Sequence, residues 1–173
     1  MNGHLPVHAQ ADDRGHTAGP QTQACAVEAA PLDFDTVEAR IDAIAETALT
    51  SAADAVSRVS ELLELGETVL ERWIEARGEQ PTKETREGFR LLALHRQGAK
   101  GEPSFNACRE SCRELAYHYN LVTLEPEHPA LESRVHMAAL VTKHLLLFVS
   151  GKMQVAGLGE FCCSSKPVRL SGS

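Results

Sequence analysis

The chain has 173 residues, a hydrophobic fraction of 43% and a formal net charge of −7 at pH 7. A chain of this length and apolar content is expected to fold as one domain with a sizeable core and a tail. The acidic balance, with no Lys/Arg cluster of the usual kind in the sequence, argues against a nucleic-acid partner and against a general phosphate-binding surface.

Residues 1–32 mix Gly, Pro, Gln, Thr and His without apolar periodicity, which predicts a disordered N-terminal tail. This segment has neither the basic start nor the apolar core of a secretory signal, so we expect a cytoplasmic location. The five cysteines of the chain, an odd number, are then expected to be reduced thiols.

The segment 33–77 predicts a long acidic amphipathic helix. Asp35 and Glu38 have the spacing of a capping box, and apolar residues then recur every three or four positions along one face. This apolar stripe changes register near Ser51 and then resumes. We expect the helix either to bend or break at Gly66, or to extend from the domain as an oligomerisation arm.

Three further helices are predicted over residues 81–98, 104–123 and 129–156, separated by loops that contain Gly and Pro. The sequence has no convincing strand pattern. The predicted fold class is therefore all-α, a bundle of four to five helices over residues 33–160. Residues 161–173 are predicted to form a flexible C-terminal tail.

The longest apolar run, residues 137–149, contains Lys143 and His144 and is shorter than the roughly 20 residues that a membrane span needs. We therefore predict a buried core helix here and no membrane span. His144 shares a face with Leu140 and Phe148 inside this run, so we expect it to lie in the core. A histidine there is either a core residue with satisfied hydrogen bonds, or a metal ligand, haem ligand or proton carrier.

Charge is distributed unevenly along the chain. Residues 33–77 are rich in Asp and Glu, whereas the segment of the next two predicted helices carries a series of cations: Lys83, Arg86, Arg90, Arg96, Lys100, Arg109 and Arg113. An acidic helix that docks on more basic ones would improve the electrostatic fit within a chain or between two chains. The alternative is that both sets of charges lie on solvated helix faces, where ion pairs contribute little.

Cys108 and Cys112 lie four residues apart on the predicted helix 104–123. They continue the three-four step of Phe105 and Leu115, which predicts that both thiols face the core as small apolar residues. Two thiols one turn apart could instead bind zinc or another soft transition metal, with further ligands from elsewhere in the chain. A disulfide between them would require local unwinding of the helix.

The further ligands that the sequence offers are His95, His144, Cys162 and Cys163. The last two are adjacent in a segment that we expect to be exposed and mobile, where Lys166 lies nearby to favour the thiolate. They are therefore the candidate redox-sensing residues, and the alternative is that they are incidental cysteines of a tail.

The sequence has no nucleophile elbow, P-loop, zinc-protease or dinucleotide-binding motif, and we predict no cofactor. The long amphipathic helix favours a non-enzymatic cytoplasmic interaction protein, such as a regulator, adaptor or assembly factor. It would form a homo-oligomer or bind a protein partner through its helices. The alternative is a metal- or redox-responsive bundle, with Cys108, Cys112 and His144 as metal ligands, or with Cys162 and Cys163 as redox-active thiols.

Overall fold

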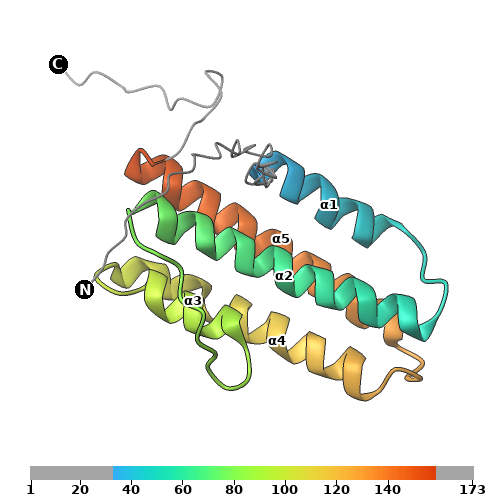
Figure 1. Ribbon diagram of the computed structural model, residues 1–173. Coiled ribbons are helices and arrows are strands. Elements are labelled where there is room, and N and C mark those ends of the chain that lie inside the picture. Colours follow the sequence, from blue (N-terminus) through green and yellow to red (C-terminus); the bar gives the residue numbers. More distant parts are fainter. Residues whose placement is uncertain (1–32, 159–173) are drawn as a thin grey trace, which may run out of the picture. The chain divides into compact units, whose positions relative to one another are not determined.

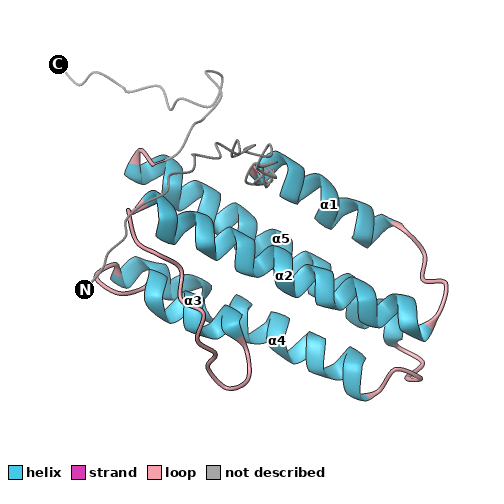
Figure 2. Ribbon diagram, viewed as in Figure 1, coloured by secondary structure: helices cyan, strands magenta, loops and turns pink. Residues whose placement is uncertain are grey.

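The computed structural model describes residues 33–158, a part of the chain that consists of helices and their connecting loops (Figure 2). This part contains five α-helices and one short 3₁₀ helix: α1 (Phe34–Glu46), α2 (Ala52–Ala76), α3 (Arg90–Gly98), η1 (Pro103–Cys108), α4 (Arg109–Leu124) and α5 (Leu131–Ala156). The predicted all-α bundle is confirmed. The tails predicted over 1–32 and 161–173 lie outside the described residues. No helix in the described part is both long and apolar enough to cross a lipid bilayer.

α2 and α5 lie side by side at the centre of the bundle (Figure 1). α1 packs on one side of this pair, mainly against α5, and α4 packs on the other side against both helices. The short α3 contacts α2 and α4. Because α5 touches α1, α2 and α4, it buries side chains along most of its length, from Val135 to Met153.

An aromatic cluster joins α2, α3, η1 and α5. The Trp73 ring stacks on Phe105 with ring centroids 4.9 Å apart, and the Trp73 indole N–H donates to the Gly98 carbonyl oxygen at 3.0 Å. Phe148 of α5 meets Phe105 edge-on at 5.9 Å between centroids. Each aromatic pair contributes about 0.5–1.5 kcal/mol beyond its burial. The cluster therefore fixes η1 on the α2–α5 pair, and η1 in turn positions the start of α4.

The segment 33–77 forms two helices rather than one, and the break lies at residues 47–51 instead of at Gly66. The break follows from a helix cap, because the Ser51 Oγ accepts a hydrogen bond from the Asp54 N–H at 3.1 Å. The Asp54 carboxylate in turn accepts from the Thr50 N–H at 2.9 Å. The change of register near Ser51 is thus a helix boundary, and the long amphipathic helix is α2 alone.

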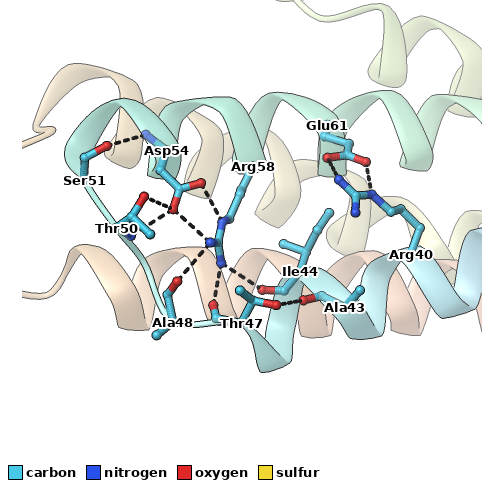
Figure 3. A network of polar contacts seen from close by, with 10 residues as sticks. All are labelled: Arg40, Ala43, Ile44, Thr47, Ala48, Thr50, Ser51, Asp54, Arg58 and Glu61. Carbon is cyan, nitrogen blue, oxygen red and sulfur yellow. Dashed lines mark hydrogen bonds and ion pairs between the residues drawn. The ribbon is translucent and has the colours of Figure 1, made fainter.

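Arg58 of α2 binds the end of α1 across the break between the two helices (Figure 3). Its guanidinium donates to the carbonyl oxygens of Ile44, Thr47 and Ala48, at the end of α1. It also donates to the Asp54 carboxylate at 2.8 Å. The last carbonyls of a helix have no partner within the helix, and a cation there interacts favourably with the helix dipole. Arg58 therefore caps α1 from a residue of α2.

Gly66 lies buried inside α2, which passes through it without a break. A Cβ atom at this position would come within 2.8 Å of the Leu115 Cδ2 on α4 and within 3.2 Å of the Leu91 Cδ1 on α3. The missing side chain thus lets α2 approach α3 and α4 closely.

Residues 79–89 are not helical, so the helix predicted over 81–98 begins only at Arg90. A tight turn over residues 86–89 prevents an earlier start. Its central residues, Glu87 and Gly88, have φ angles of 53° and 85°, and the flanking residues pair their N–H and C=O groups at 3.0 Å. Positive φ at both central positions is the pattern of a type I′ turn.

Side chains of α3 hold the extended stretch that precedes this turn. The Gln97 side chain accepts from the Thr82 N–H at 2.8 Å and donates to the Gln80 carbonyl oxygen at 2.7 Å. The Arg90 Nε donates to the Thr82 carbonyl oxygen at 2.9 Å. Backbone groups that a helix would pair internally are therefore satisfied by side chains.

The remaining helix boundaries are close to the predicted ones. The segment predicted over 104–123 is helical, although it starts as the 3₁₀ helix η1, and α5 matches the helix predicted over 129–156. α5 ends at Gly157, whose φ of 67° is the left-handed conformation that commonly terminates a helix. At α1, Asp33 provides the cap instead of Asp35, because its Oδ1 accepts from a backbone N–H of the first turn at 2.7 Å.

Candidate functional site

The junction of η1 and α4 places two cysteines in the core. Cys108 is the last residue of η1, and Cys112 lies in the first turn of α4. Both side chains are fully buried, and both are free thiols. The three-four spacing predicted this burial correctly.

His95 of α3 is buried beside the pair. Its Nε2 lies 3.4 Å from the Phe105 carbonyl oxygen, and the Cys108 thiol donates to the same oxygen at 3.2 Å. The His95 ring also stacks on the Phe105 ring, with centroids 5.9 Å apart. The Phe105 carbonyl oxygen of η1 thus contacts both the His95 imidazole and the Cys108 thiol.

The thiols of Cys108 and Cys112 shift each other's pKa in opposite directions. The hydrogen bond from the Cys112 thiol lowers the pKa of Cys108 to about 6, while desolvation by burial opposes the shift and His95 reinforces it. The same hydrogen bond, together with burial, raises the pKa of Cys112 well above its ordinary value. The first proton therefore leaves Cys108, and the Cys112 thiol donates to the resulting thiolate.

His144 lies on the exposed side of α5, so its predicted position in the core is wrong. Its Nδ1 lies 2.9 Å from the Ser111 Oγ, a contact that joins α5 to α4. Leu140 on the same face is 48% exposed. The run 137–149 has apolar residues on all sides of the helix, and its periodicity therefore does not indicate which face is buried.

The predicted metal ligands are only partly brought together. Cys108 and Cys112 are neighbours of His95, whereas His144 is on the solvent side of α5. Among residues 33–158, no three His, Cys, Asp or Glu side chains are grouped so that they could hold a metal ion. Cys162 and Cys163 lie outside the described residues. Metal binding by Cys108, Cys112 and His144 stays a prediction, as does the redox activity of Cys162 and Cys163.

The exposed face of α5 carries apolar side chains, two histidines and a few neutral polar residues, and no exposed Asp, Glu, Lys or Arg from residue 133 to the end of the helix. Met137, Leu140 and Leu147 are 40%, 48% and 55% exposed, and their spacing places them on one side of the helix with His144. The cations of α5 are half-buried and pair with carboxylates of other elements: Arg134 with Glu125, Lys143 with Asp42, and Lys152 with Glu102. We call the apolar surface of Met137, Leu140 and Leu147 the α5 stripe.

The acidic helix α2 contacts the cation-rich segment 83–113 at Arg90. The Arg90 guanidinium forms ion pairs with Glu67 at 3.3 Å and Glu71 at 2.5 Å. Burial raises the pKa of Glu67, with Arg90 acting against the rise. Most of the other cations of that segment instead surround a pocket between α3 and the start of α4. Sequence reasoning missed this cluster because its members are spread over residues 86–113. The uneven distribution of charge along the sequence was the signal from which this cluster of cations could have been predicted.

Comparison of this chain with models of protein families, with characterised proteins and with solved structures finds no match. The functional proposals therefore depend on the side-chain arrangements described above.

Proposed function

We propose that this protein is a non-enzymatic interaction protein that associates with a second copy of itself through the α5 stripe. Such a protein acts as an oligomerising regulator, adaptor or assembly factor, and we place it in the cytoplasm. The observation that supports self-association most directly is the absence of these charged residues from the exposed face of α5 from residue 133 onward. Single exposed apolar side chains are common on monomers, but several on one helix face without an exposed Asp, Glu, Lys or Arg favour an interaction surface.

The α5 stripe is suited to antiparallel contact with its own copy. If two α5 helices cross at His144, Leu140 of each copy lies near Leu147 of the other. Met137 then lies opposite Gly151, where a Cβ atom would meet nothing within 4 Å. A large side chain would thus enter the space left by a small one, and the twofold axis would repeat each contact.

The ion pairs of α5 also favour the α5 stripe as the interface, because they hold the cations of this helix away from it. Lys143 lies at the edge of the α5 stripe, and its ammonium is turned toward α1, where Asp42 and Glu38 accept from it at 2.7 Å and 3.3 Å. A lysine of this kind can cover apolar surface with its stem while its charge stays outside the contact. The centre of the proposed interface therefore contains apolar side chains and His144 but no Asp, Glu, Lys or Arg, and depletion of charged residues is typical of an interface core.

Sedimentation-velocity ultracentrifugation of the full chain over a concentration series tests this proposal. We expect the wild-type protein to form a dimer and Leu140→Glu to be monomeric, because each dimer would bury two unpaired carboxylates. Leu124→Glu is the matched control, since Leu124 of α4 is 78% exposed and lies outside the stripe. Circular dichroism shows whether both variants keep the wild-type fold.

A second variant adds no charge. Gly151→Leu fills the space opposite Met137, so we expect it to weaken the dimer while the monomer stays folded. A wild-type chain that remains monomeric at every concentration would contradict the proposal. A dimer that survives in folded Leu140→Glu would place the contact on another surface.

The two buried thiols, one turn apart beside His95, support a second function, a response to oxidants or soft metal ions. The thiolate is the reactive and metal-binding form of cysteine, and Cys108 is the member of the pair that ionises first. The pair lies where the 3₁₀ helix η1 joins α4, and hydrogen-bond geometry is poorer in a 3₁₀ helix. This junction can therefore unwind more readily than the middle of an α-helix, as a Cys108–Cys112 disulfide would require.

Treatment with hydrogen peroxide tests the oxidant response. One peroxide molecule takes two electrons and two protons from the pair, which forms one S–S bond and releases two water molecules. We expect peptide mass spectrometry to find this cross-link in the wild type and in a Cys162→Ser/Cys163→Ser control. Elemental analysis of untagged protein tests the metal response. Thiols that stay reduced, together with protein that binds no Zn²⁺, would dismiss the second function.

A further inference from the structure

A pocket of about 450 Å³ opens between α3, the loop after it and the start of α4. Its lining includes five cations, Arg86, Arg96, Lys100, Arg109 and Arg113, and one carboxylate, Glu87. Five positive charges and one negative charge give these six side chains a formal charge of +4, on a chain whose total is −7. The volume is in the range of pockets that hold small molecules.

Most of this positive charge has no counter-charge within the described residues. The Glu87 carboxylate accepts from Arg113 at 3.1 Å and from Arg86 at 3.5 Å, so one carboxylate serves two guanidinium groups. The other three cations of the pocket have no carboxylate of residues 33–158 within ion-pair distance. Cations held close together repel one another, and a bound anion would remove that repulsion.

The backbone holds Glu87 in a fixed position at the pocket. Its φ of 53° lies in a region that residues other than glycine rarely adopt, and the turn is closed by the paired backbone of Arg86 and Phe89. Such conformations cost free energy and are concentrated at functional sites. Here the turn places the Glu87 carboxylate within reach of both Arg86 and Arg113, which brings the two guanidinium groups together at the pocket.

The chemistry of the lining indicates which anion fits. Four of the five cations are arginines, whose planar guanidinium groups bind phosphate through paired N–H donors. Leu92 and Ala99 add apolar surface, and the buried His95 adds an aromatic ring. We propose that this pocket binds a small organic phosphate with at least two phosphoryl groups, whose apolar or aromatic body contacts Leu92, Ala99 and His95.

Two features of the charge distribution favour a small ligand with several phosphoryl groups. One phosphate dianion would leave about half of the +4 charge unbalanced, whereas two phosphoryl groups come close to balancing it. The net charge of −7 repels a long polyanion such as a nucleic acid, because only the part inside the pocket gains from the cations. The sequence-based argument against a general phosphate-binding surface therefore does not extend to this pocket.

Isothermal titration calorimetry of the full chain tests the proposal with three probes: adenosine diphosphate, inorganic pyrophosphate and adenosine. We expect one saturable site for the first two and no binding of adenosine. Arg96→Ala and Arg109→Ala should each weaken binding of adenosine diphosphate about tenfold, because each removes charged hydrogen bonds to phosphate. Both side chains are exposed, so the variants should fold as the wild type does, which thermal melting checks.

Two lysines offer a matched pair. Lys100 and Lys83 are both exposed, but only Lys100 lines the pocket. We expect Lys100→Ala to weaken binding about threefold and Lys83→Ala to weaken it less, since only Lys100 lines the pocket and the effect of an exposed charge falls off with distance. The pocket is independent of the α5 stripe, so Leu140→Glu should bind adenosine diphosphate as the wild type does.

Equal weakening in the two lysine variants would overturn the proposal, because the effect would then come from overall charge. The absence of saturable binding for both adenosine diphosphate and pyrophosphate would also overturn it. So would a short single-stranded RNA that binds more tightly than adenosine diphosphate, since the cations would then belong to a nucleic-acid surface.

Discussion

Arg58 shows how much a single side chain contributes where two helices meet. Its side chain is 12% exposed, and its guanidinium reaches three carbonyl groups at the end of α1 as well as Asp54. Arg40 and Glu61 form a second link between the same two helices, with an N–H···O contact of 2.8 Å, but Arg40 is 55% exposed (Figure 3). An exposed pair of this kind contributes little, because water competes for both charges.

We therefore expect Arg58→Ala to lower the free energy of unfolding by about 2 kcal/mol, since several hydrogen bonds from a charged donor are lost. Arg40→Ala is the control and should cost less than about 1 kcal/mol. Arg58→Lys should lie nearer the alanine variant, because an ammonium cannot reproduce the planar fork. Urea denaturation followed by circular dichroism measures all three. Equal losses for Arg58→Ala and Arg40→Ala would contradict the capping role of Arg58.

At the scale of helices, two glycines control how closely α2 approaches its neighbours. A Cβ atom at Gly98 would lie 2.9 Å from the Trp73 Cδ1 and 3.0 Å from the Phe105 Cε1. A Cβ atom at Gly66 would lie 2.8 Å from the Leu115 Cδ2. The distances are similar, but the neighbours differ, because two stacked rings cannot move aside as a leucine methyl group can.

This difference predicts that a substitution by alanine is destabilising at Gly98 and nearly neutral at Gly66. Gly98→Ala should destabilise the fold by about 2 kcal/mol, because the added methyl group forces the Trp73–Phe105 stack apart. Gly66→Ala should stay within about 1 kcal/mol of the wild type, because the gain in helix propensity offsets the repacking of Leu115. Thermal and urea unfolding measure both variants. A Gly66→Ala that is as unstable as Gly98→Ala would show that the leucine is held as rigidly as the rings.

The helix boundaries that were predicted correctly have clear local signals, and the wrong ones have local signals that a helical pattern or an unusual residue obscures. α5 matches its predicted range because glycine and proline mark both of its ends. Ser51 caps α2 through Asp54, only three residues further on, but the apolar stripe resumes beyond it, so the segment has the pattern of one helix. The turn at Glu87 was missed because glutamate is not a residue that indicates positive φ.

At the candidate sites of the whole molecule, the parts that were not predicted depend on contacts between segments. The burial of Cys108 and Cys112 follows from periodicity along one helix. His95 was one of several candidate partners for this pair, and the sequence could not select it, because the choice depends on how α3 packs against η1. The basic pocket likewise requires the fold to bring together cations from residues 86–113, and the free face of α5 appears only when its neighbours are in place.

The charges of the whole molecule determine how its stability responds to acid. Several carboxylates have pKa values below the ordinary ones because they accept hydrogen bonds in the fold: Asp33, Asp54, Glu102 and Glu125. The pKa of Asp54 is lowered to about 2, chiefly because Arg58 donates to this carboxylate. Glu67 is shifted in the opposite direction by burial. The four carboxylates with lowered pKa values outnumber this one carboxylate with a raised pKa.

A carboxylate whose pKa is lower in the folded state stabilises the fold above its unfolded pKa, and this contribution is lost as pH falls through the folded value. For Asp54 these limits are 3.8 and about 2. We therefore expect the free energy of unfolding to fall steadily from about pH 4 to about pH 2.

Asp54→Asn should be less stable than the wild type at pH 7 and should lose less stability across the window from about pH 4 to about pH 2, because its side chain no longer binds a proton. Arg58→Ala should flatten the same window by a different route, since it removes the main cause of the low pKa without removing the titrating group. Urea denaturation at half-unit steps of pH measures the three slopes. An unchanged slope in both variants would show that the acid response arises at other carboxylates.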